Sequence, residues 1–171
     1  MKQDTNFIGF SVILLATLLP GMALGEFRSP RAVALGGAGR ANPVLNDSIY
    51  QNPSFASFLP NYSWSGNFKA LGEGRGRAYD ISVLDGRSEL FQAGLAYELR
   101  DLFSSVHISA SHKIDERTTV GLGAKLYFSQ DKSQLSNFRE FSASATYAPL
   151  EWLQVAAILD NLDRTPEMAA L

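Results

Sequence analysis

Two histidines and the serines beside them are the residues of this chain best suited to do chemistry. The chain has 171 residues, no cysteine and only two histidines, His107 and His112. They are five residues apart, so on one strand they face opposite sides and cannot share a metal ion. On the same side of such a strand lie His107 and Ser109, the pair that an acyl hydrolase needs, with Glu98 on the neighbouring strand. Serine is common on this side of every segment, so its presence beside His107 is no sign of catalysis. We expect no catalytic site, no metal site and no cofactor.

The composition narrows the function classes further. With no cysteine, the chain has no disulfide, no thiol nucleophile and no thiolate metal site. Its formal net charge of −2 gives no reason to expect nucleic acid as a partner. Apolar residues make up 46% of the chain and charged residues 19%, which is typical of a folded single domain.

The N-terminus predicts export. Lys2 precedes an apolar run over residues 7–19, and Ala23-Leu24-Gly25 offers the small residues of a signal-peptidase site. The run has about 13 residues, whereas a bilayer-spanning helix needs about 20. We therefore expect a cleaved signal peptide over residues 1–25 and a mature chain that begins near Glu26.

Residues 62–162 alternate between apolar and polar side chains, which predicts antiparallel β-strands with two different faces. About seven strands are expected, with room for an eighth, followed by a C-terminal tail over residues 163–171. The predicted strands are 62–68, 79–83, 91–99, 106–114, 120–128, 141–147 and 153–159. The fold class is therefore all-β, an antiparallel barrel or partial barrel.

Such strands suit either a soluble barrel, with its apolar face inward, or an outer-membrane barrel, with its apolar face toward lipid. Three features favour the membrane. The polar face carries mostly small residues, aromatic residues lie near the strand ends, and long polar connections alternate with short ones. We expect Glu98, His107, Lys113 and Lys125 to face a polar lumen. We interpret the Gly-Arg repeat that contains Arg77 as a polar loop. A site that binds the phosphate of an outer-membrane lipid is a weaker interpretation.

A segment rich in glycine, proline and asparagine precedes the strands. Its cluster Gly36, Gly37 and Gly39 lacks the Gly-Lys-Ser/Thr and the glycine spacing of a nucleotide-binding loop. The stretch over residues 28–55 resembles the N-terminal signature of the outer-membrane transport protein family, which includes the long-chain fatty-acid transporter FadL and its PorV-like relatives. The residues that carry the resemblance are Pro30, Arg31, Gly36, Gly37, Gly39, Asp47, Asn52 and Pro53. Ser54 and Arg40 depart from the usual alanine and small apolar residue.

The resemblance implies a barrel in the cell outer membrane whose N-terminal segment, residues 26–61, folds into the lumen as a plug. It implies transport or binding of a hydrophobic, fatty-acid-like small molecule. In the PorV-like branch the barrel instead serves a protein secretion system, and neither branch is an enzyme. A soluble periplasmic barrel that holds lipid remains a third interpretation. Because barrels of this family are much longer, we expect either a truncated member of the family or a partial barrel that a second chain or a secretion component completes.

Overall fold

The computed structural model describes residues 39–70, 77–101, 103–129 and 139–163. The expected signal peptide, the first part of the expected plug-like segment and all but the first residue of the expected tail lie outside these ranges.

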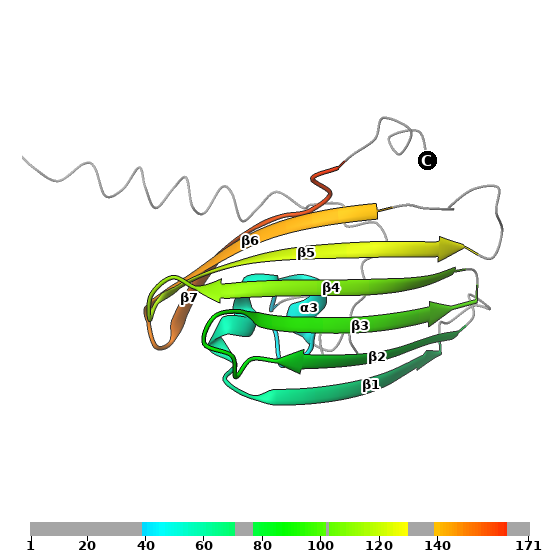
Figure 1. Cartoon of the computed structure of the whole chain (residues 1–171), viewed down its shortest axis with the longest axis horizontal. Helices are drawn as coiled ribbons and strands as arrows, with labels where there is room; N and C mark the ends of the chain where they lie inside the picture. The colour runs from blue at the N-terminus through cyan, green and yellow to red at the C-terminus, as the bar shows by residue number, and fades with distance from the viewer. Residues whose placement is uncertain (1–38, 71–76, 102, 130–138, 164–171) are drawn as a thin grey trace, which may run out of the picture.

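Seven strands form one antiparallel sheet in which each strand pairs with the next along the chain (Figure 1). They are β1 (Tyr62–Ala70), β2 (Arg77–Asp85), β3 (Gln92–Arg100), β4 (Phe103–Lys113), β5 (Thr118–Ser129), β6 (Arg139–Leu150) and β7 (Leu153–Leu159). The prediction of an all-β partial barrel with about seven strands is confirmed. The sheet is open, because no described strand pairs β1 with β7.

Five of the seven strands are longer than the alternation alone predicts, most clearly β6, whereas β3 and β7 have the predicted length. The pattern stops at Tyr147, and Pro149 cannot donate to a ladder hydrogen bond. The strand nevertheless continues to Leu150, because the pairing with β7 shifts register between Tyr147 and Leu150. A bulge of this kind is where a sheet accommodates proline.

The sheet curves around two short helices, α3 (Asp47–Gln51) and the 3-10 helix η1 (Pro53–Phe58), which lie within its concave side (Figure 1). We call residues 39–61 the plug segment. Its contacts extend across the sheet, because Asn46 hydrogen-bonds to Ser82 of β2 and Asn52 to Thr146 of β6. The half-barrel therefore encloses the plug segment from both sides.

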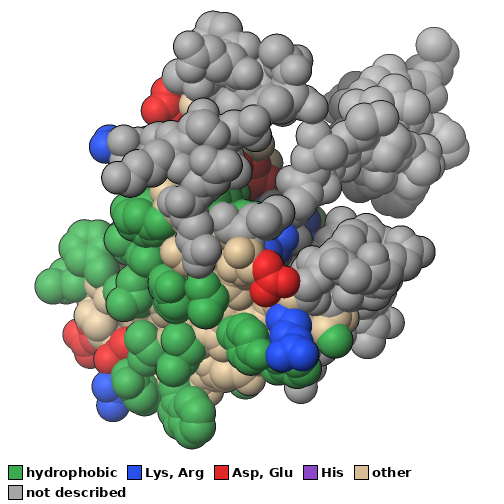
Figure 2. Space-filling model, turned by 90° about the vertical axis from the view of Figure 1, so that its right-hand side faces the viewer, with side chains coloured by type: hydrophobic (Ala, Val, Ile, Leu, Met, Phe, Trp, Pro, Cys, Tyr) green, Lys and Arg blue, Asp and Glu red, His purple; other side chains and the backbone are tan. Residues whose placement is uncertain are grey.

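The two faces of the sheet are reversed relative to a water-soluble fold. The concave face buries polar side chains, such as Glu98 and Ser105, each fully buried. The convex face exposes large apolar ones, such as Trp64 at 77% and Leu122 at 65%. In the end-on view of Figure 2, hydrophobic side chains gather at the surface. Polarity thus increases inward, toward the plug segment.

The apolar core between the plug segment and the sheet is small. Ile49 and Ala56 of the two helices pack against Leu84 of β2 and Ala96 of β3. Such a core contributes little apolar burial, so the plug segment depends on its polar contacts and on close backbone packing.

Candidate functional site

The junction between α3 and η1 is fixed by an Asn-Pro pair. The residue before a proline disfavours the helical region, and Asn52 is extended, with φ −157° and ψ 87°. Pro53 then begins η1, where its fixed φ suits a first helical position and its missing N–H is not needed. The local sequence therefore ends one helix, begins the next and leaves the Asn52 side chain between them.

This junction is bound to β6 by a buried network of hydrogen bonds. The Asn52 amide Nδ2 donates to the Thr146 hydroxyl at 2.9 Å, and the Ser54 hydroxyl lies 2.8 Å from the same oxygen. The Ser54 hydroxyl also donates to Asn52 Oδ1 at 2.6 Å, and the Ser54 backbone N–H donates to Ser144 Oγ at 2.9 Å. All four residues are buried, so the polar groups satisfy one another without water.

The plug segment approaches the sheet backbone at two inner-face glycines. A Cβ added to Gly121 of β5 would lie 2.3 Å from the Ser54 nitrogen and 2.6 Å from the Pro53 carbonyl carbon. A Cβ at Gly94 of β3 would lie 2.5 Å from Ile49 Cγ1. Only glycine allows such an approach, which explains two of the glycines on the polar face of the strands.

A second polar cluster lies on β3 and β4 beneath α3. The buried Glu98 carboxylate accepts from Arg100 Nε at 2.6 Å and lies 3.7 Å from His107 Nε2. Ser105 Oγ lies 3.1 Å from the same His107 nitrogen. In a hydrolase triad the acid and the serine occupy opposite ring nitrogens. Here both face Nε2, and Ser105 rather than Ser109 is the partner, so the cluster lacks triad geometry.

Tyr50 of α3 connects this cluster to the neighbouring strands. Its ring lies edge-on to the His107 ring, with centroids 4.7 Å apart. Its hydroxyl donates to Asp80 Oδ1 at 3.2 Å, and Asn67 Nδ2 donates to the same oxygen at 3.1 Å. Asp80 pairs directly across the strands with Glu98. Two carboxylates in this arrangement repel, so the donors around each are what allow both to lie there.

The sequence interpretation missed three members of this cluster, Asp80, Arg100 and Ser105. Ser105 and Arg100 have the same strand parity as His107 and Glu98, so extending each predicted strand by one residue would have placed them on the polar face. Asp80 is the polar residue between Tyr79 and Ile81 in the predicted strand. The missing information was the pairing register, which places Asp80 opposite Glu98.

The structure does not gather the two lysines that the sequence singled out. Lys125 lies opposite His107 in the pairing of β4 with β5, with its Nζ 4.4 Å from the centre of the Tyr127 ring. Lys113 lies on the same face of the sheet but at the end of β4, where it is exposed. Lys125 therefore adjoins the polar cluster, whereas Lys113 does not.

The signature residues fall into two groups. Pro30, Arg31, Gly36 and Gly37 lie outside the described residues. The others lie in the plug segment, where Gly39 has φ 105°, in the left-handed region that favours glycine, and Asp47 begins α3. Arg40 forms an ion pair of 2.6 Å with Asp160, just past the end of β7. The plug segment is thus tied to the last strand as well.

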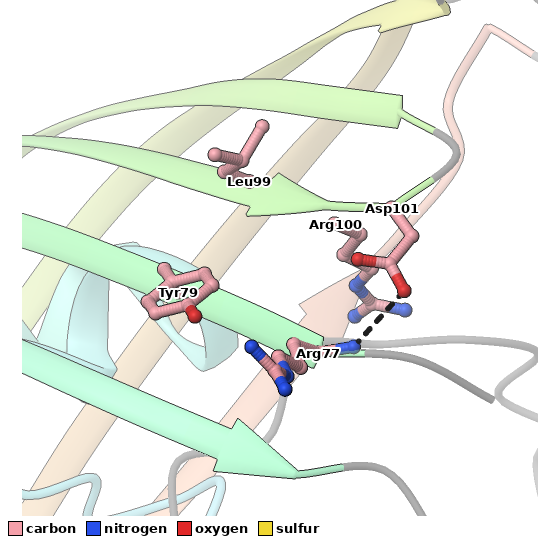
Figure 3. A pocket seen from close by; sticks show the side chains of 5 residues that line it. All are labelled: Arg77, Tyr79, Leu99, Arg100 and Asp101. Carbon is pink, nitrogen blue, oxygen red and sulfur yellow. Dashed lines mark hydrogen bonds between the residues drawn. The ribbon is translucent and has the colours of Figure 1, made fainter. Parts of the chain in front are cut away.

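A shallow hollow of about 260 Å³ lies where β2 begins and β3 ends (Figure 3). Tyr79 and Leu99 of the convex face line it, together with Arg77, Arg100 and Asp101. The Arg77 backbone N–H donates to the Asp101 carboxylate, and the Arg100 side chain forms an ion pair with Glu98. Arg77 is the only residue of the predicted polar Gly-Arg loop that the structure describes, and Figure 3 shows its guanidinium directed away from Asp101.

The described residues contain neither a membrane-spanning helix nor a metal-binding cluster. Among the described residues, no helix is long and apolar enough to cross a membrane, and no three histidine, aspartate or glutamate side chains are grouped to hold a metal ion. Neither a family model, nor a curated protein, nor a solved structure matches the chain.

Proposed function

We propose that this chain forms the lipid-facing wall of a plugged outer-membrane β-barrel that carries hydrophobic, fatty-acid-like small molecules. The observation that supports the membrane location is the reversal of the two faces. Leu122, Ile81 and Trp64 project from the convex face, while the concave face is polar and in contact with the plug segment. Outer-membrane barrels have this arrangement, with an apolar band outside and a polar interior.

The free-energy balance favours lipid over water at the convex face. Burying one large aliphatic or aromatic side chain contributes roughly 1.5–3 kcal/mol. The exposed residues of this type occur on all seven strands, for example Phe68, Leu95, Phe141 and Leu159. Lipid would cover them without any change in the sheet. A soluble barrel around an apolar ligand would need the opposite orientation of both faces.

The proposed role in transport rests on the resemblance of the signature. In the structure, part of that signature lies where the plug segment is attached to the sheet. Asn52 and Ser54, which flank Pro53, attach the plug segment to β6. A plug held by hydrogen bonds and a small apolar core can be released at moderate cost, because each such bond contributes only about 0.5–1.5 kcal/mol net. This suits a segment that opens for a passing molecule.

A protein-secretion role is the second candidate, and the open sheet favours it. Among the described strands, β1 and β7 lie at the edges of the sheet, where backbone groups could accept a strand from another protein. Purification of the chain from solubilised membranes would distinguish the two roles. A transporter should bind fatty acid and copurify with no secretion component.

One substitution pair tests the membrane location. Leu122→Arg places a charge on the convex face of β5, where lipid would make it cost about 2–4 kcal/mol near the bilayer centre. In water the same exposed position tolerates the change within about 0.5 kcal/mol. Glu116→Arg, in the exposed turn before β5, is the matched control. Membrane fractionation and unfolding in lipid vesicles measure both, and equal behaviour of the two variants would refute the location.

Fatty-acid binding tests the transport role separately. The chain, folded in detergent micelles, should bind a long-chain fatty acid, as measured by displacement of a fluorescent fatty-acid analogue. Asn52→Ala should change the rate of fatty-acid entry in cells that lack their own transporter. A chain that enters the membrane but neither binds nor moves fatty acid would refute this role and leave the secretion role.

A further inference from the structure

The hollow beside Arg77 lies where the convex face changes from apolar to charged. An apolar track of three cross-strand pairs leads to it along β2 and β3: Val83 with Leu95, Ile81 with Tyr97, and Tyr79 with Leu99. Pairs on one face are two residues apart, so the apolar track is about 13 Å long. The next positions of the same parity are Arg77 and Asp101, and both are exposed. The apolar track therefore ends at two charged residues.

The aromatic residue in the lining suits the hollow to the boundary between lipid tails and headgroups. Tyr79 is 46% exposed, and its ring centroid lies 5.1 Å from that of Phe68 on β1. Tyrosine is enriched at this boundary in membrane proteins, because its ring is apolar and its hydroxyl is polar. In the proposed membrane barrel, the hollow would therefore face headgroups and the apolar track would face acyl chains.

The two charged residues at the end of the apolar track do not pair with each other. Figure 3 shows the Arg77 guanidinium directed away from Asp101, on the side of the hollow where Tyr79 lies. The Asp101 carboxylate accepts the Arg77 backbone N–H at 3.3 Å, and neither side chain forms an ion pair within the described ranges. The third charged residue of the lining, Arg100, is paired with Glu98. The hollow thus offers one unpaired cation and one unpaired anion.

We propose that this hollow binds the headgroup of a membrane lipid that carries both a phosphate and an amine. The Arg77 guanidinium donates to the phosphate, since its planar N–H groups match two phosphate oxygens. The amine, as an ammonium, donates to the Asp101 carboxylate. The volume of 260 Å³ is below the roughly 300–1,000 Å³ of pockets that enclose a whole small molecule. The hollow therefore holds the headgroup, and the acyl chains lie on the apolar track.

Asp101 decides between lipid classes. A phosphate without an amine, or the carboxylate of a fatty acid, would bring negative charge beside Asp101 with nothing to offset the repulsion. An amine next to the phosphate removes that repulsion and adds an ion pair. This inference rests on the proposed membrane location. It assigns a ligand class to Arg77, which the proposed transport role leaves without a function.

The test compares two lipids on the full chain, purified in detergent. Native mass spectrometry measures binding of phosphatidylethanolamine and of phosphatidylglycerol with the same acyl chains. We expect the ethanolamine lipid to bind about tenfold more tightly.

Two substitutions then separate the two charges. Arg77→Gln should weaken binding of both lipids by about tenfold, because both carry the phosphate. Asp101→Asn should weaken only the ethanolamine lipid, since the asparagine oxygen still accepts the Arg77 N–H but carries no charge. Arg117→Gln is the matched control, because Arg117 is exposed in the turn between β4 and β5, at the opposite end of the sheet. It should bind both lipids as the unchanged chain does.

The possible outcomes distinguish this inference from the function on which it rests. Equal affinity for the two lipids, or an Arg77→Gln chain that binds lipid like the Arg117→Gln chain, would overturn the headgroup site. Displacement of the ethanolamine lipid by a long-chain fatty acid would also overturn it, because the hollow would then belong to the transported molecule. A chain that stays in solution without detergent would instead refute the membrane location itself.

Discussion

Adding one methyl group at Gly121 should release the plug segment from the sheet. In Gly121→Ala the new Cβ would lie 2.3 Å from the Ser54 nitrogen, 2.6 Å from the Pro53 carbonyl carbon and 2.7 Å from Ser54 Cα. All three are backbone atoms, so no side chain can rotate away. The junction must move by about 1 Å to restore ordinary contact distances of 3.4 Å or more. The substitution therefore acts on the backbone of η1 rather than on the strand.

The expected loss of stability combines three effects. Overpacking costs about 1–3 kcal/mol. Moving the Ser54 N–H away from Ser144 Oγ, now at 2.9 Å, loses about 0.5–1.5 kcal/mol more. Replacing a strand glycine by alanine returns about 0.5–1 kcal/mol. We expect Gly121→Ala to lower the free energy of unfolding by about 1–3 kcal/mol.

Gly66→Ala is the control, because its Cβ would meet only the Asp80 carbonyl oxygen, at 3.8 Å. It should leave stability unchanged or raise it by up to about 1 kcal/mol. Urea unfolding in detergent micelles gives both free energies, and amide hydrogen exchange over residues 46–58 reports release of the plug segment. If Gly121→Ala matched Gly66→Ala in stability and kept that exchange slow, the close approach of η1 to β5 would be wrong.

Three further predictions concern the polar contacts. Asn52→Ala removes the buried amide that donates to Thr146 and accepts from Ser54, and should cost about 1–3 kcal/mol, measured by urea unfolding, with faster exchange confined to the plug segment. Glu98→Gln removes the charge paired with Arg100; the full cost of about 3–5 kcal/mol for a buried pair is reduced to about 1–3 because Arg100 is partly exposed. The double variant with Arg100→Met should recover part of that loss, and no recovery would refute the pairing. Two backbone N–H groups in the turn after β4 hold the pKa of Asp115 below its ordinary value, so its contribution to stability is present above that value and lost as pH falls through the folded pKa. Asp115→Ala should flatten this pH dependence, as urea unfolding at several pH values would show.

The number of strands and the orientation of their faces could be predicted from the sequence, because period-two alternation is a local signal. It placed Leu95 and Glu98 on opposite faces without knowledge of the partner strands. The bulge that carries β6 through Pro149 could not be predicted, because it depends on the register with β7. The same holds for the pairing of Asp80 with Glu98.

The helices of the plug segment could not be predicted from the sequence either, but for a different reason. α3 has five residues and η1 six, too short for a helical period to be recognised. Their positions are set by contacts with strands β2 to β6, most of which are distant in sequence. The resemblance identified Asn52 and Pro53 as important, but only the structure shows that Asn52 attaches the plug segment to Thr146.

The anchor between Asn52 and Thr146 also determines an order of events. The two residues are separated by 94 positions, whereas each strand pairs with its immediate neighbour along the chain. Contacts between neighbouring elements close small loops and form early, while distant ones wait for large loops to close. The plug segment leaves the ribosome before any strand, yet its binding surface is complete only when β6 has paired. We therefore expect the plug segment, although it is made before the seven described strands, to fold after them, against hairpins that are already assembled.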